Sequence, residues 1–147
     1  MTKKVKIDIL VDAQALLSEF PKGGEITNHN LIVMTNQVGP STYQTAFKDK
    51  LITEAGPGDS INWKIRSKTI DTQLSLVEYT GDANMQVVFK NKPSRVKDDD
   101  SEFDGFVKDT LPQETISTTY TFSFCEKKQP NLVWHWDPDI IIPYPPK

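Results

Sequence analysis

The stretch that most suggests binding chemistry alternates aromatic and polar residues from Trp134 to Asp139. Neighbouring side chains of a β-strand point to opposite faces, so the two tryptophans would share one face and the polar residues the other. Aromatic rings can cover the apolar face of a sugar while carboxylates accept hydrogen bonds from its hydroxyls. The pattern predicts a candidate ligand site formed by Trp134, His135, Trp136, Asp137 and Asp139. In the competing interpretation, both tryptophans fill a core and Asp137 caps the bend at Pro138.

A second cluster, from Asp98 to Asp104, is strongly acidic. Flexible acidic loops can supply the roughly six to eight oxygen ligands that calcium takes. The spacing departs from that of an EF-hand loop, and Gly105 stands in the wrong place for one. We therefore expect a solvated acidic excursion at about residues 95–112, with calcium binding as the alternative and no other cofactor.

The sequence contains no recognisable catalytic motif. His29 and His135 are far apart, and Cys125 is the only cysteine. A single cysteine excludes an intrachain disulfide, and its place at the end of an expected strand suggests a structural thiol. Ser60 and Ser101 lack the surroundings of a nucleophile, and Gly56-Pro57-Gly58 does not suit a phosphate-binding loop. These features predict that the protein is not an enzyme.

The charge pattern argues against nucleic acid as a partner. The chain of 147 residues has a formal net charge of −3, and Lys3, Lys4 and Lys6 are its only basic cluster. A nucleic-acid-binding surface usually needs a broad positive face. No apolar run approaches the roughly 18 residues of a membrane span, so we expect a soluble, cytoplasmic protein.

Composition and periodicity favour strands over helices. β-branched and aromatic residues outnumber alanine and leucine several-fold. Alternating or short apolar runs predict strands, and the weakest of these patterns is at residues 43–47. One short helix is expected from Asp12 to Phe20, and Pro21 ends it. The expected strands are Lys4–Val11, Asn30–Thr35, Tyr43–Phe47, Ile61–Arg66, Leu74–Tyr79, Met85–Lys90, Thr115–Cys125, Leu132–Trp136 and Ile140–Ile142.

These elements predict an all-β protein, an antiparallel β-sandwich of jelly-roll or immunoglobulin-like type with one short helix. It would form a single domain over residues 1–147 and end in a proline-rich tail at residues 143–147. A parallel α/β sheet would need long helices between strands, and none is expected. The central packing would set one inner face, Ile61, Trp63 and Ile65, against another, Tyr120, Phe122 and Phe124.

Several segments together resemble the AidA/PixA inclusion-body protein family. They span nearly the whole chain in order, and the closing Trp-x-Trp-Asp-Pro is the most specific of them. The segments are Ile7–Ala13, Asn30–Met34, Gly58–Lys64, Tyr120–Phe124 and Trp134–Ile140. His135 inside the aromatic run and a content of only 3 methionines depart from the family pattern.

The resemblance implies a bacterial protein, in some species under quorum-sensing control and able in some cases to accumulate as intracellular inclusions. It implies no catalytic residues. The first functional hypothesis is therefore a non-enzymatic protein that associates with itself or another protein, by default as a homodimer. The second is a lectin-like module that binds a carbohydrate or another small ligand, with or without calcium.

Overall fold

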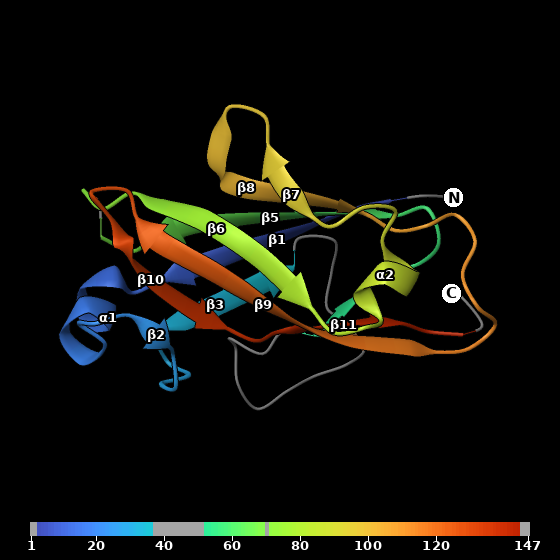
Figure 1. Cartoon of the computed structure of the whole chain (residues 1–147), viewed down its shortest axis with the longest axis horizontal. Coiled ribbons are helices and arrows are strands. Elements are labelled where there is room, and N and C mark those ends of the chain that lie inside the picture. The colour runs from blue at the N-terminus through green and yellow to red at the C-terminus, as the bar shows by residue number, and fades with distance from the viewer. Residues whose placement is uncertain (1–2, 37–51, 70, 145–147) are drawn as a thin grey trace.

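The computed structural model describes residues 3–36, 52–69 and 71–144. Two β-sheets pack face to face around one hydrophobic core (Figure 1). This arrangement confirms the predicted all-β sandwich. The predicted strand at residues 43–47 and the last three residues of the predicted tail lie outside the described residues.

The first sheet, sheet I, has the strand order β3-β1-β5-β8-β7. Its outer strands are short, and the three central ones have eight residues each. The bounds in that order are Ile32–Asn36, Lys4–Val11, Ser60–Ser67, Asp99–Phe106 and Ser94–Val96.

The second sheet, sheet II, is built around β9 (Ile116–Glu126), an 11-residue strand. Strand β6 pairs with one edge of β9, while β10 and β11 pair with successive parts of its other edge. Strands β2 and β4 extend sheet II beyond β10 and β11 respectively. The bounds are Leu74–Gly81 for β6, Gln129–Trp136 for β10, Asp139–Ile142 for β11, Gly24–Glu25 for β2 and Ile52–Glu54 for β4.

Both sheets are mixed, whereas the sequence predicted purely antiparallel pairing. β1 and β5 are parallel, as are β10 with β2 and β11 with β4. Parallel neighbours need a long crossover connection. Here the chain between β1 and β5 contributes β2 and β4 to sheet II, and β3 to one side of β1, before β5 pairs with the other side of β1. Local alternation shows that a strand exists but does not show the direction of its neighbour.

The predicted core is confirmed. Ile61, Trp63 and Ile65 of β5 are buried, and Tyr120, Phe122 and Phe124 of β9 face them from the other sheet. The ring centroid of Trp63 lies 5.3 Å from that of Phe122 and 5.7 Å from that of Tyr120. The indole nitrogen of Trp63 also donates a hydrogen bond to the Tyr120 hydroxyl at 3.1 Å.

The described residues form two short helices, one as predicted and one in place of a predicted strand. Helix α1 (Ala13–Glu19) begins after Asp12, whose carboxylate accepts from the Ala15 amide. Residues Met85–Val88, part of an expected strand, form helix α2 instead. Asp82 starts this turn, since its carboxylate accepts from the Asn84 amide and its carbonyl from the Met85 amide.

The acidic excursion expected at 95–112 contains a strand that the sequence analysis did not predict. Most of its acidic residues lie in β8, which pairs with β5 over Lys64 to Ser60 and folds back on β7. Asp98 supplies the turn between β7 and β8 with a φ of 64°. Phe103 and Gly105 are buried while Glu102 and Asp104 lie on the other face. With one large apolar residue pointing inward, β8 had too weak an alternation to be recognised.

Candidate functional site

Both tryptophans of the predicted ligand site lie in the core. Trp134 and Trp136 on β10 are each 1% exposed. The indole nitrogen of Trp134 donates to the Phe20 carbonyl at 2.8 Å, and that of Trp136 to the Met34 sulfur at 3.4 Å. The rings therefore offer no open face on which a sugar could stack, and this placement favours the core interpretation.

The polar residues of the same stretch lie on the opposite face, as the alternation predicted. Asp137 accepts a hydrogen bond from the Thr121 hydroxyl at 2.8 Å, and Asp139 accepts one from the Thr119 hydroxyl at 2.7 Å. His135 stands opposite Ser123, and its Nδ1 is buried without a hydrogen-bond partner. The structure thus separates the five predicted residues into a buried aromatic pair and an outer polar row.

Asp82, which follows β6 at the other edge of β9, was missed in the sequence. It accepts hydrogen bonds from the Thr118 hydroxyl at 2.7 Å and from the Thr119 amide at 3.1 Å. Partial burial favours the neutral acid, but the hydrogen bonds from Thr118, Thr119 and Asn84 outweigh it, so the pKa of Asp82 is lowered. Asp82 on one edge of β9 and Asp137 and Asp139 on the other thus hold threonine side chains of this strand in place.

The acidic cluster is organised by hydrogen bonds within β8. The hydroxyl and amide of Ser101 donate to Asp99 at 2.6 and 2.9 Å and, with a smaller contribution from Glu102, lower the pKa of Asp99 to about 2. The hydrogen bond with Asp99 is also the main reason that the pKa of Glu102 is raised. Among the described residues, no group of three or more His, Cys, Asp or Glu side chains could hold a metal ion. Calcium binding stays a prediction.

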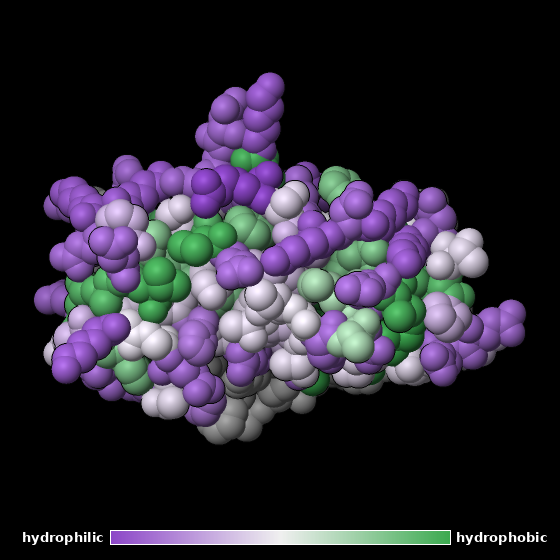
Figure 2. Space-filling model, viewed as in Figure 1, coloured by the Kyte–Doolittle hydropathy of each residue, from purple (hydrophilic) through white to green (hydrophobic). Residues whose placement is uncertain are grey.

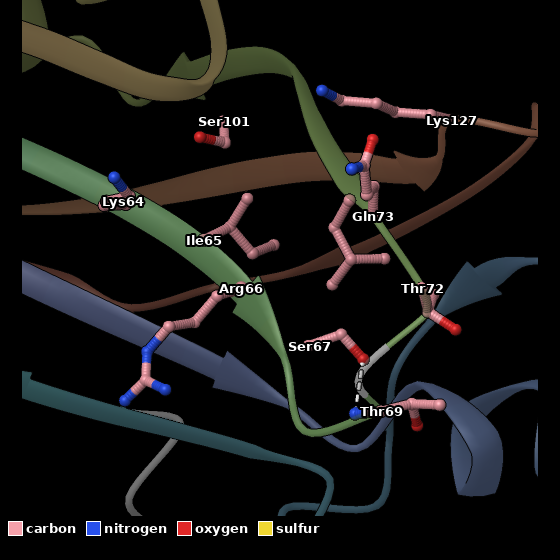
Figure 3. Close-up of a pocket in the computed structure, with 10 residues that line it drawn as sticks. Lys64, Ile65, Arg66, Ser67, Thr69, Thr72, Gln73, Ser101 and Lys127 are labelled. Carbon is pink, nitrogen blue, oxygen red and sulfur yellow. Dashed lines mark hydrogen bonds between the residues drawn. The ribbon is translucent and has the colours of Figure 1, made fainter.

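A pocket of about 350 Å³ opens where β5, the start of β6 and the β9–β10 turn meet (Figure 3). Ile65 points into it, whereas Arg66 points away over β1. Leu74 also lines the pocket. Lys127 lines it but forms an ion pair with Asp100 at 2.9 Å. Its other lining residues are Lys64, Ser67, Thr69, Thr72, Gln73 and Ser101. The pocket has a mixed polar and apolar lining and lacks an aromatic ring that could act as a platform.

Cys125 is a free, buried thiol, although its neighbour Phe124 points to the opposite side of β9. Burial raises the pKa of Cys125, which keeps the thiol protonated and weakly nucleophilic. This environment agrees with the structural thiol expected from the sequence.

The fold defines a mixed β-sandwich protein whose aliphatic core contains a cluster of aromatic rings. Residues 3–130 match the family DUF8788, described as a domain of unknown function, and the chain belongs to that family. No curated protein matches the chain. No helix in the described part of the chain is long and apolar enough to cross a membrane.

The chain is similar in structure to the inclusion body protein PixA from Burkholderia cenocepacia J2315. The TM-score is 0.69 at 12% sequence identity, and the match covers 97% of this chain and 96% of that one. At this identity the similarity shows a shared fold. It supports the resemblance to the AidA/PixA family that the ordered segments indicated.

Proposed function

We propose that this chain is a non-enzymatic bacterial protein that works by associating with copies of itself. The observation that carries the proposal is the fold shared, over nearly all of both chains, with a protein described as an inclusion body protein. The small net charge of −3 also supports it, because a weakly charged surface opposes self-association little.

The residues with catalytic potential support a non-enzymatic role. The thiol of Cys125 is buried and its raised pKa disfavours the reactive thiolate. The outer carboxylates Asp82, Asp137 and Asp139 are engaged with threonine hydroxyls. Such contacts stabilise strands rather than place an acid and a base beside a substrate.

Light scattering over a concentration series at neutral pH tests the proposal. We expect the mean molar mass to rise above that of the 16.7 kDa monomer as concentration increases. A mass that stays at the monomer value up to millimolar concentration would contradict self-association. Growth of the mass should be reversible on dilution, which separates association from aggregation of unfolded chains.

Carbohydrate binding remains a separate prediction, now limited to the outer residues His135, Asp137 and Asp139 because both tryptophan rings are buried. A glycan array read with and without added calcium tests it. Binding that is lost in Asp137→Asn would support the prediction, and no binding under either condition would contradict it.

A further inference from the structure

Two edge strands, β6 and β7, are poorly suited to join another chain. β6 is an edge strand that pairs with β9, but a bulge interrupts it between Leu76 and Glu78. The guanidinium of Arg95 donates to the Leu76 carbonyl at 3.0 Å and occupies part of that edge. β7 has only three residues and also contains an irregularity. Bulges, short strands and charged side chains all discourage edge-to-edge pairing.

The outer face of sheet I instead carries exposed side chains of opposite charge on neighbouring strands. On β1 and β5, Lys4, Lys6, Lys64 and Arg66 are exposed on the side opposite the buried Ile7 and Trp63. Asp8 is the one acid among them. On the adjacent β8, Glu102 and Asp104 share this outer face. We call β1 with β5 the basic half and β8 the acidic half.

The two halves lie in register across the sheet. Lys64 of β5 is paired with Glu102 of β8. Two residues earlier on β5, Asn62 lies between Lys6 of β1 and Asp104 of β8. Phe106, at the end of β8, is 54% exposed and is the most exposed large apolar residue in the described structure. The face therefore combines charges of both signs with an aromatic side chain, features that protein interfaces use for orientation and for anchoring.

We propose that two copies of this chain associate through the outer face of sheet I, with the basic half of each copy against the acidic half of the other. This proposal rests on the proposed self-association and names the surface responsible. A two-fold axis along the strands, between β5 and β8, would bring each β5 over the partner's β8. Both copies then use the same patch, because the patch on each copy contains a basic half and an acidic half.

The charge arrangement favours a second copy over other partners. A nucleic acid or an anionic membrane would be attracted by Lys4 and Lys6 but repelled by Glu102 and Asp104 on the same face. The hairpin formed by β7 and β8 stands out from the body as a hydrophilic projection (Figure 2). A flat anionic surface would meet this acidic projection, whereas a second copy could place its basic half beside it.

The size of the face predicts a weak complex. Three strands of eight residues cover roughly 27 Å by 14 Å, or about 400 Å², which is about half the area that each partner buries in a standard interface. Screening is weak at low salt, with a Debye length of about 10 Å at 0.1 M, and strong at 1 M. Association should therefore be clearest at low ionic strength.

Charge-reversal variants test the surface by sedimentation velocity at about 0.05 M salt. The basic-half variant is Lys6→Glu with Arg66→Glu, and the acidic-half variant is Glu102→Lys with Asp104→Asn. Asparagine keeps the oxygen that accepts from Asn62 at 2.8 Å. Each variant alone should weaken self-association at least about tenfold, because like charges then face each other. Mixing the two variants should restore a dimer that contains one of each.

Lys22→Glu with Lys128→Glu is the matched control, since it reverses two exposed lysines outside sheet I. It should associate as the unchanged chain does. If the unchanged chain associates but both halves can be reversed without effect, the surface is wrong and self-association stands. If the unchanged chain is monomeric at every concentration, both proposals fail. A near-ultraviolet circular dichroism spectrum that is unchanged in each variant shows that the fold is intact. Binding of added DNA or anionic vesicles to this face, in place of a second copy, would also overturn the assignment.

Discussion

Phe122 lies at the centre of the aromatic core. Its ring centroid lies between 5.1 and 5.9 Å from those of Trp63, Tyr79, Phe103, Tyr120 and Trp136. These neighbours come from both sheets, so this one side chain connects β5, β6, β8, β9 and β10.

Phe122→Ala should lower the free energy of unfolding by about 3–5 kcal/mol, because it leaves a cavity among rings that cannot all collapse into it. Ser123→Ala, on the outer side of the same strand, should cost less than about 1 kcal/mol. Denaturant unfolding of the two variants measures both values. Equal losses would mean that the inner and outer faces of β9 are reversed.

Asp99 provides a second test at the scale of single residues. Its pKa of about 2 lies below the value of about 3.9 in an unfolded chain. The ionised carboxylate therefore stabilises the fold above about pH 4, and this stabilisation is lost as the pH falls toward 2. Ser101→Ala removes the hydroxyl donor but keeps the amide, so the pKa of Asp99 should rise part of the way to its usual value.

Carboxyl-carbon chemical shifts followed by NMR over a pH series measure this change. The pKa of Asp100, which is lowered chiefly by a hydrogen bond from Lys127, should stay low in the same variant. An unchanged Asp99 titration in Ser101→Ala would show that the hydroxyl is not responsible.

At the scale of elements, two glycines allow the short strand β2 to join β10. Gly23 and Gly24 have φ values of 80° and 98°, in a region that L side chains rarely adopt. A Cβ at Gly23 would lie 2.5 Å from the Val133 carbonyl oxygen, whereas at Gly24 it would meet nothing within 4 Å. Both positions are thus conformationally restricted, and only the first is also crowded by backbone.

Gly23→Ala should therefore destabilise the fold more than Gly24→Ala, by about 1 kcal/mol or more. The excess loss should be accompanied by faster amide exchange at Ile26, whose amide donates to the His135 carbonyl at 2.9 Å. Thermal unfolding combined with hydrogen exchange measures the two effects. Similar losses in the two variants would show that positive φ alone controls this turn.

At the scale of the whole molecule, a single cluster of buried side chains extends through both sheets and includes Leu16 of α1 and Val88 of α2. Because no part of this cluster can be removed without exposing the rest, the chain should unfold in one cooperative transition. Far-ultraviolet and near-ultraviolet circular dichroism should give coincident denaturation curves. Two separated transitions would contradict the predicted single domain.

The sequence by itself determined most of the sandwich. Strict alternation in β1, β5 and β9 identified their inner faces, because the side-chain period of a strand is two and one face must be buried. It also predicted that the side chains of Trp134 and His135 point to opposite faces of their strand. The same rule failed for β8, where Phe103 shares its inward face with Ser101 and Gly105. It also failed for Met85–Val88, where a turn started by Asp82 produced a helix.

Only the tertiary structure decided which face of a strand meets another sheet and which strands become neighbours. The sequence left Trp134 and Trp136 open to two interpretations, and the packing of both rings against Phe124 and Phe122 decided for the core. The pairing of β5 with β8 likewise brought Lys64 beside Glu102, 38 positions later in the chain. It thereby created a face that carries both positive and negative side chains. Pairing between distant strands depends on how the whole chain crosses between sheets, which no local pattern of side chains encodes.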